Sequence, residues 1–535
     1  MGEETKGWTV RSKAASHKRH GKIILFTCLV LPGCTPSADD DAVSTSSTPD
    51  VISPTPTVPT PTPDPRYPDW TNVSSDSTAF WEQTNIDTAS GGYFTGVARN
   101  GTITNRNKWT RCVSRQVYGF TRTFQMTGNI AWLDLARTGV RWLLDHALDT
   151  QHGGFYQQLD ETGHTVVSDE RTMFDLAYAL NGLAVFFEVT HDLEVEHAIN
   201  ATYDLLEARA WDSEWGGYYK ALTQDMSSVL DDGKDFNALV DPATAFLFTL
   251  YAATASYGDD APRAGAYKER LRQIGFLMAD HLVDPDGTGW IGENFTREWE
   301  YDPANGPFGD RTLCGHNLKA AWTLVRIHMI TGEWLFLQEA ETLLEPVIET
   351  CLDRERGGVY DMVDRATNEL VYGEQKTWWQ QEEGILALQL IGEAATKSYY
   401  TRLGLETRSF YLEWFPDPVY GEVFSVVEGD GAVKDDTKGN EWKSAYHSVE
   451  VTYFGLLYDA FFVSQAPVTL YYHFDAADVD RAVRLVPVVV PNGRLEVSDP
   501  VLLDGEALTL QTSTQVVIPA GAEGLLEVVY DYEPY

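Results

Sequence analysis

Six polar or ionisable side chains stand at matching places along the sequence and are the first candidates for a functional site. They lie 63 to 75 residues apart on otherwise apolar segments: Arg115, Tyr178, Asp241, His316, Glu383 and His447. Large polar groups that all face inward are costly in a dry core, so a wet, concave binding site is the cheaper explanation. Histidine titrates near neutral pH and is suited to moving protons. We therefore expect acid/base chemistry at these positions.

Aromatic residues cluster near the same places. They are Trp109, Tyr118, Trp299, Trp322, Trp378, Trp379, Trp442 and Tyr446. Aromatic faces with nearby carboxylates and amides suit sugars, which offer C–H faces and a rim of hydroxyls. The run WWQQEE (378–383) is the strongest part of the pattern, because we expect that these adjacent side chains cannot all be buried. The predicted ligand is a small-molecule carbohydrate.

A repeat places these residues. The pattern Asp, three residues, Gly-Gly and two large residues begins at Asp87, Asp149, Asp212 and Asp353, and looser copies begin at Asp284 and Asp417. A period of 62–72 residues accommodates two helices and their connections. Each copy has the signature of a β-hairpin, such as GGFYQQLDETGHTV (153–166), whose turn is DETG (160–163). A basic residue follows 16–22 positions after the second Gly or its equivalent: Lys108, Arg171, Lys234, Arg311, Lys376 and Lys438.

The segments between the repeats are helical. Met173, Ala177, Leu180, Ala184 and Phe187 recur at helical spacing in a segment that is apolar on nearly every side, which predicts a buried helix. The next segment (193–210) has one apolar face and one charged face, as an outer helix would. The unit is therefore outer helix, Asp loop, hairpin and inner helix. Six such units predict an all-α (α/α)6 barrel over residues 70–464, with the hairpins at one end.

The two ends of the chain differ from this middle part. Residues 35–69 are rich in Ser, Thr and Pro and predict a disordered linker, whereas residues 465–535 contain short β-rich runs and predict a small β-sandwich-like domain. In residues 1–34 a basic run and a short apolar run precede LPGC (31–34), which resembles a bacterial lipobox. Acylation of Cys34 would make the protein an exported, membrane-anchored lipoprotein. A signal that stays uncleaved, or is cleaved without lipid attachment, is the alternative.

Composition excludes several classes of protein. A net charge of −39 leaves no basic stripe for the phosphates of nucleic acid, and we attribute it to a solvated acidic surface. Membrane contact is expected only through the N-terminal lipid. Beyond the signal segment and Cys34, the cysteines are Cys112, Cys314 and Cys351, which are too scattered to predict a disulfide framework. Cys314 and His316 have no second pair nearby, so a structural zinc site is rejected.

Five motifs in the right order resemble the N-acylglucosamine 2-epimerase family, which includes cellobiose 2-epimerases and mannose isomerases. They are KWTRCVSRQVYGF (108–120), RTMFDLAYALNGLA (171–184), GHNLKAAWTLVR (315–326), KTWWQQEEGILAL (376–388) and KGNEWKSAYH (438–447). The resemblance covers about residues 70–464. It implies the same (α/α)6 barrel and a sugar epimerase or isomerase that works on the open-chain sugar without a cofactor or metal.

The resemblance also implies roles for single residues. His316 and His447 would be the acid/base pair that removes and returns the proton at C2, and Arg115 would stabilise the enediolate oxygen. Trp378 and Trp379 would stack on the sugar. The further substrate contacts would be Asn237, Asp241, Gln381, Glu383, Tyr178, Tyr118 and Trp322.

Three positions depart from the family. Asp241 stands where many members have a histidine, Lys319 where the family has a glutamate, and Glu450 where it has an arginine. Asp241 would take over ring opening or bind a hydroxyl. We expect Lys319 and Glu450 to compensate one another as an ion pair between adjacent repeats.

Two other functions remain open from the sequence. One is a glycoside hydrolase-like enzyme on the same barrel, which would need two carboxylates about 5–9.5 Å apart, with Asp241 and Glu383 as the candidates. The other is a catalytically inactive sugar-binding protein.

Overall fold

The computed structural model describes residues 64–254, 261–498 and 500–535. The described residues belong to one compact unit. The predicted signal segment with Cys34, and the linker up to residue 63, lie outside the described residues.

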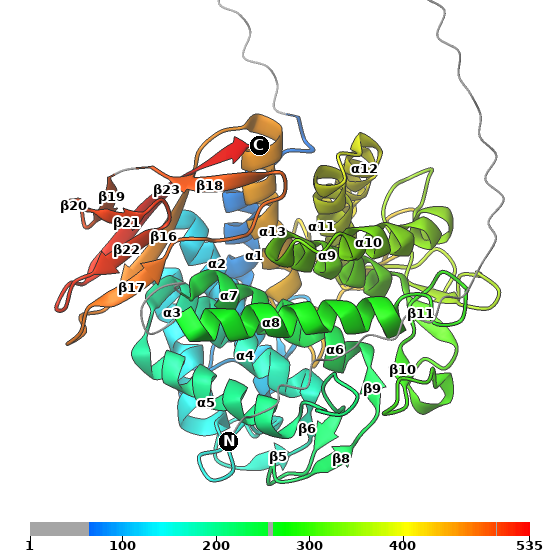
Figure 1. Ribbon diagram of the computed structural model, residues 1–535, viewed down its shortest axis with the longest axis horizontal. Helices are drawn as coiled ribbons and strands as arrows, with labels where there is room; N and C mark the ends of the chain where they lie inside the picture. Colours follow the sequence, from blue (N-terminus) through cyan, green and yellow to red (C-terminus); the bar gives the residue numbers. More distant parts are fainter. Residues whose placement is uncertain (1–63, 255–260, 499) are drawn as a thin grey trace, which may run out of the picture. The chain divides into compact units, whose positions relative to one another are not determined.

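Outer and inner helices alternate along the described chain as the repeat predicts (Figure 1). The outer helices are α1 (Trp70–Thr84), α3 (Ile130–Trp142), α5 (Leu193–Arg209), α8 (Ala261–Leu277), α10 (Trp334–Pro346) and α12 (Ser398–Trp414). The inner helices are α2 (Thr110–Thr127), α4 (Met173–Thr190), α6 (Phe236–Pro242) with α7 (Phe248–Ala253), α9 (Cys314–Thr331), α11 (Trp378–Ala394) and α13 (Tyr446–Tyr458). A π-helical turn (Ala243–Leu247) joins α6 to α7.

The inner helices contact one another in a closed circuit. Helix α2 packs against α4, α4 against α6, α6 against α9, α9 against α11, α11 against α13, and α13 against α2 again. Two of these segments, Met173–Thr190 and Phe236–Ala253, are long and apolar enough to cross a membrane, but 94% and 83% of their residues are buried inside the protein. Their apolar character is therefore explained by a position in the core.

The Gly-Gly copies form short antiparallel hairpins or ladders before each inner helix. The strands are β1 (Gly96–Val97), β2 (Ile103–Asn105), β3 (Lys108–Trp109), β4 (Gln158–Leu159), β5 (Val166–Ser168), β6 (Arg171–Thr172), β7 (Ala221–Leu222), β8 (Val229–Asp231), β9 (Lys234–Asp235), β10 (Asn294–Phe295), β11 (Arg311–Leu313), β12 (Met362–Asp364), β13 (Lys376–Thr377), β14 (Val426–Val427) and β15 (Val433–Asp435). Both glycines of the second copy have positive φ, 84° at Gly153 and 69° at Gly154, which a side chain at these positions would oppose.

The aspartates of the repeat hold its loops together. Asp149 Oδ1 accepts hydrogen bonds from the backbone N–H groups of Gln151 and His152, and its Oδ2 accepts one from Arg171 at 2.9 Å. Equivalent buried ion pairs join Lys108 to Asp87, Lys234 to Asp212, Lys376 to Asp353 and Lys438 to Asp417. In the fourth repeat Arg311 is exposed instead. The recurring basic residue is thus the partner of the recurring aspartate.

The C-terminal part consists of two antiparallel sheets. One sheet contains β16 (Val468–Phe474), β23 (Gly524–Pro534), β18 (Gly493–Val497), β19 (Val501–Leu503) and β20 (Glu506–Leu508), and the other β17 (Arg481–Arg484), β22 (Gln515–Ile518) and β21 (Leu510–Thr512). Strand β16 packs against α2 and α4, and β17 against α7. Val488 and its neighbours line a cavity of about 30 Å³ together with residues of α2, α7, α9 and α13. The C-terminal segment therefore meets the inner helices directly.

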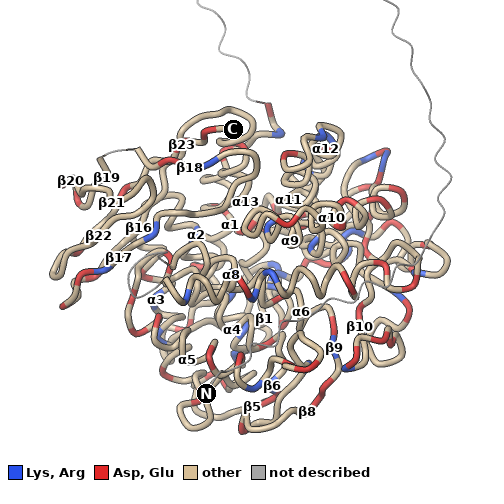
Figure 2. Tube along the Cα trace, viewed as in Figure 1, with Lys and Arg blue, Asp and Glu red and all other residues tan. Residues whose placement is uncertain are grey.

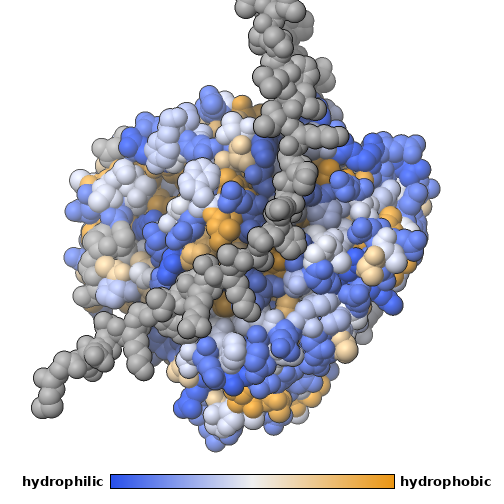
Figure 3. Space-filling model, turned by 45° about the vertical axis from the view of Figure 1, so that its right-hand side comes forward, coloured by the Kyte–Doolittle hydropathy of each residue, from blue (hydrophilic) through white to orange (hydrophobic). Residues whose placement is uncertain are grey.

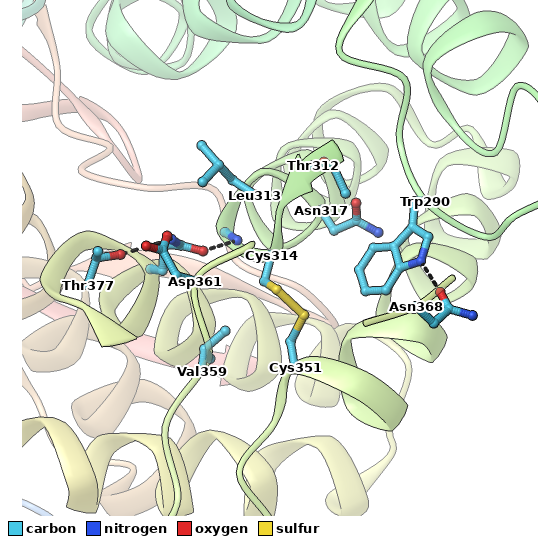
Figure 4. The surroundings of a disulfide bond; sticks show 12 residues. Trp290, Thr312, Leu313, Cys314, Asn317, Cys351, Val359, Asp361, Asn368 and Thr377 are labelled. Carbon is cyan, nitrogen blue, oxygen red and sulfur yellow. Dashed lines mark hydrogen bonds between the residues drawn. A yellow bond between two sulfur atoms is a disulfide. The ribbon is translucent and has the colours of Figure 1, made fainter. Parts of the chain in front are cut away.

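A disulfide joins Cys314 to Cys351 (Figure 4). The expectation that these scattered cysteines form no disulfide framework is therefore wrong for this one pair. The two residues are 37 positions apart. Helix α9 begins at Cys314, and the chain returns along α10 to a π-helical turn that ends at Cys351. Because α9 and α10 pack against one another, this return brings the two sulfur atoms together.

Acidic residues are distributed along the whole described trace rather than in one block (Figure 2). In the view of Figure 3, hydrophilic residues are interspersed with smaller hydrophobic patches. This distribution fits a solvated acidic surface.

Candidate active site

A cavity of about 440 Å³ opens among the first turns of the inner helices. The residues that line it are Arg115, Phe174, Tyr178, Asn237, Asp241, Pro307, Phe308, Leu313, His316, Lys319, Trp378, Trp379, Trp442 and His447. Every repeat contributes through its inner helix. A volume of this size suits a small ligand, and the wall combines aromatic side chains with polar and ionisable ones.

Five of the six predicted ring positions meet in this cavity: Arg115, Tyr178, Asp241, His316 and His447. The common period explains this convergence, because each position stands near the start of an equivalent inner helix. Asn237, Trp378 and Trp379 line the cavity as predicted. The ring centroid of Trp379 lies 5.5 Å from that of His316 and 6.0 Å from that of His447.

Four of the predicted contact residues lie outside the cavity wall: Gln381, Glu383, Tyr118 and Trp322. Gln381 is fully buried, donates to the carbonyl of Val359 and accepts from its N–H at 2.7 Å. Glu383 is fully buried and accepts a hydrogen bond from the indole of Trp322. Tyr118 lines the separate small cavity at Val488.

The expectation that the adjacent side chains of WWQQEE cannot all be buried holds through Trp379 alone, which is half-buried at the cavity, whereas the other five are buried. Gln380, Gln381, Glu382 and Glu383 are at most 1% exposed. Each has a partner inside the protein, for example the Tyr411 hydroxyl, which donates to Glu382 at 2.7 Å. Buried polar groups are tolerated when they are hydrogen-bonded, and the contacts between neighbouring repeats supply these partners.

His316 is held by a residue that the sequence reasoning missed. Its Nδ1 atom lies 3.0 Å from both carboxylate oxygens of Glu293. Its ring stacks on Phe236 at a centroid distance of 4.0 Å. Glu293 is 4% exposed and also accepts from the hydroxyl of Thr312 at 2.7 Å. This carboxylate orients the imidazole so that its other nitrogen is available.

A signal for Glu293 exists in the repeats. One position is polar in this and four other copies, and its carbonyl accepts a hydrogen bond from the first N–H of the preceding inner helix: Gln157, Lys220, Glu293, Asp361 and Ser425. In the fourth copy this position carries a carboxylate, which reaches His316 on α9, the inner helix that follows. The fourth copy, VDPDGTGW (283–290), has no Gly-Gly pair, so Glu293 is difficult to align with the equivalent residues of the other copies.

Lys319 pairs with Asp241, so the expected Lys319–Glu450 ion pair is wrong. Its Nζ atom lies 2.7 Å from Asp241 Oδ1 and 2.9 Å from the hydroxyl of Tyr178. Burial acts to lower the pKa of Lys319, but Asp241 and Tyr178 outweigh it and raise this pKa. Lys319 therefore stays protonated and donates to Asp241 at the cavity wall.

Arg115 is a buried guanidinium in the cavity. It lies over the ring of Tyr178 at 3.8 Å and donates to the carbonyl of Trp442 at 3.0 Å. Its Nε atom has no hydrogen-bond partner among the described residues. Because a buried guanidinium N–H without a partner is costly, this group is suited to an anionic or partly anionic oxygen.

His447 lies between two carboxylates. Its Nδ1 atom is 3.4 Å from Glu450 Oε2 and 3.8 Å from Glu383 Oε1. Burial lowers the pKa of His447 to about 4, so the imidazole is neutral at physiological pH. Among the described residues these three form the one group with ligand atoms close enough for a metal, all within 4.8 Å of one another. Lys319 and Arg115 place positive charge near His447, which works against a cation there.

A ring of helices around a cavity with aromatic side chains, a buried histidine, a half-buried histidine, a lysine and an arginine defines an enzyme site for a small polar molecule. The comparisons with known proteins agree. The family model for N-acylglucosamine 2-epimerase matches residues 92–451, and the chain belongs to this family. It is accordingly an isomerase-type enzyme.

Individual relatives are distant in sequence but cover the same region. The chain is 22% identical over 377 residues to cellobiose 2-epimerase of Bacteroides fragilis, across 69% of this chain and 93% of that protein. It is 23% identical over 387 residues to D-mannose isomerase of Marinomonas mediterranea, across 70% of this chain and 93% of that protein. A crystal structure of D-mannose isomerase superposes with a TM-score of 0.65 at 20% identity, over 72% of this chain and 97% of that one.

Proposed function

We propose that this protein is a sugar 2-epimerase or aldose–ketose isomerase that acts on the reducing end of a mono- or disaccharide. The observation that carries the proposal is the placement of His316 and His447 in one cavity, each within 6.0 Å of the ring of Trp379. A sugar stacked on Trp379 would therefore have an imidazole near either side of its C2 carbon.

The proposed reaction is proton transfer at C2 of the opened sugar. This proton lies alpha to the carbonyl, so its removal leaves an electron pair that forms the C1–C2 enediolate. Return of the proton to the opposite face of C2 gives the epimer, and return to C1 gives the ketose. A neutral imidazole can act as the base and the resulting imidazolium as the acid.

Other cavity residues would bind and stabilise the reacting sugar. Arg115 would stabilise the enediolate oxygen, because its guanidinium lacks a full set of partners. Trp378 and Trp379 would stack on the ring, and Asn237 and Asp241 would bind hydroxyls. Lys319 Nζ lies 2.7 Å from Asp241 Oδ1 and would hold this side chain in place beside the sugar.

The closed circuit of inner helices supports the (α/α)6 barrel as the architecture. The disulfide between Cys314 and Cys351 supports export, since such bonds persist in oxidising compartments. Together with the lipobox-like LPGC, it favours a lipoprotein anchored through Cys34 on the outer side of a bacterial membrane. A Cys34→Ser variant that still fractionates with membranes would contradict this location.

Exchange of the C2 proton in deuterated water, measured by NMR against a panel of mono- and disaccharides, tests the activity. His316→Asn and His447→Asn should each slow exchange by about 10²–10⁴-fold. Wild-type rates in both variants would exclude the assigned pair. Release of new reducing ends without exchange would instead indicate glycoside cleavage, and tight binding without exchange a binding protein.

Glycoside cleavage has less support from the geometry. Of its two candidate carboxylates, Asp241 is paired with Lys319 and Glu383 lies behind the cavity wall, bonded to Trp322. A cleaving enzyme needs both carboxyl groups beside the bond that is broken.

A further inference from the structure

The surroundings of His447 contain one more carboxylate than a single imidazole nitrogen can use. Glu383 reaches Nδ1 from α11, and Glu450 reaches it from the next turn of α13. Glu383 is 0% exposed and Glu450 is 3% exposed. One N–H can serve only one of them fully, so the two carboxylates must have different roles.

The outer oxygen of each carboxylate is already occupied. The indole of Trp322 donates to Glu383 Oε2, and the hydroxyl of Tyr446 donates to Glu450 Oε1 at 2.9 Å. The inner atoms, Glu383 Oε1, Glu450 Oε2 and His447 Nδ1, have no hydrogen bond of normal geometry among the described residues. These three atoms therefore face one another in a closed, dry space.

Two ionised carboxylates are costly in such a space, because little water screens their repulsion. Burial raises the pKa of Glu383 to about 8. Lys319 acts to lower this pKa, and the nearby Glu450 acts to raise it further. For Glu450 burial acts to raise the pKa, but His447, Lys319 and Tyr446 outweigh it and lower the pKa. At neutral pH the proton therefore resides on Glu383 and the charge on Glu450.

We propose that Glu450 is the positioning residue of His447: it accepts the Nδ1–H and so directs Nε2 of the imidazole into the cavity, while Glu383 stays protonated. The shorter of the two distances to Nδ1, 3.4 Å, supports this assignment. The remaining charged groups near His447 are Arg115 on α2 and Lys319 on α9, and neither accepts a proton from it. Glu450 thus provides a hydrogen-bond acceptor for the Nδ1–H of His447, which an arginine at this position could not do.

The catalytic consequence rests on the proposed function. When Nε2 takes the C2 proton, the C–H electron pair moves into the enediolate and His447 becomes an imidazolium. The Glu450 carboxylate stabilises this cation through Nδ1–H, and the same Nε2–H bond later breaks to return the proton to carbon. Glu450 touches neither the sugar nor the proton in transit.

The direct test reads the protonation of His447 without any substrate. In the full-length protein labelled with ¹⁵N-histidine, the signal of His447 is identified by its loss in His447→Asn. At pH 7 we expect a proton on Nδ1 and none on Nε2. A wild-type His447 that carries its proton on Nε2 would overturn the proposal, even if no Glu450 variant folds.

Two variants separate the carboxylates. Glu450→Gln should mix the two tautomers and lower kcat and C2 exchange by about 10- to 100-fold, with little change in KM. Glu383→Gln, which replaces a neutral acid by a neutral amide, should keep the Nδ1–H tautomer. The reverse result, with the tautomer lost only in Glu383→Gln, would assign the role to Glu383 instead.

Glu382→Gln is the matched control, because Glu382 is equally buried on α11 but bonds to Tyr411. It should leave the His447 spectrum and kcat unchanged. If wild type shows no C2 exchange with any sugar, the proposed function fails while the tautomer measurement still decides the role of Glu450.

Discussion

The Nδ1 atom of His316 lies 3.0 Å from both carboxylate oxygens of Glu293, which comes from the hairpin that precedes the inner helix. A loop residue thus orients a helix residue 23 positions later. Glu293→Gln should replace the carboxyl group by an amide of similar shape, which can accept from Nδ1 through only one oxygen. We expect kcat to fall by about 10- to 100-fold with folding preserved.

Steady-state kinetics and circular dichroism of Glu293→Gln check this expectation. The exposed Glu298, five residues further on, provides the control variant Glu298→Gln, which should behave as wild type. Equal kcat in the two variants would show that Glu293 is not needed to orient His316.

The raised pKa of Glu383 predicts a pH-dependent stability difference. This carboxyl, with a pKa of about 8 in the folded protein, binds its proton more tightly there than in the unfolded chain. Its contribution to stability is therefore complete below about pH 4.5 and is lost as the pH rises to about 8. Across this window wild type should lose up to about 1.4 kcal/mol per pH unit relative to Glu383→Gln. Urea unfolding at pH 5 and pH 8 measures the difference, and a constant difference would contradict the assignment.

The disulfide should stabilise the enzyme without taking part in the reaction. Replacement of both Cys314 and Cys351 by serine removes a crosslink over 37 residues and should cost about 2–4 kcal/mol. Unfolding curves with and without reductant should coincide for this double variant but differ for wild type. Cys112→Ser, which alters the buried free cysteine, should keep the dependence on reductant.

The Asp of the repeat should affect stability rather than chemistry. Asp149 is 1% exposed and pairs with the buried Arg171, which also pairs with Asp169, so Asp149→Asn removes one of the two carboxylate partners of a buried guanidinium. We expect a loss of about 1–3 kcal/mol in the free energy of unfolding, with kcat near wild type below the melting temperature. A large fall in kcat of the folded variant would instead link this loop to the reaction.

The sequence alone was enough to predict the helix order and that positions such as His316 and His447 face one cavity. Because the repeats have similar lengths and the same Asp and Gly pattern, equivalent positions fall near the start of equivalent helices. The buried character of α4 and the amphipathic character of α5 follow from local periodicity. Neither inference needs a contact between distant residues.

Only the tertiary structure decided which polar groups are partners. The sequence offers Lys319 more than one carboxylate, and the fold gives it Asp241 on the adjacent helix α6 rather than Glu450 on α13. The buried run Gln380–Glu383 and the disulfide depend on the same kind of information, because each group is satisfied by a residue of another element. Periodicity determines which side of a helix a residue occupies. The packing of neighbouring repeats determines what that residue meets, and the charge states of Glu383 and Glu450 follow from it.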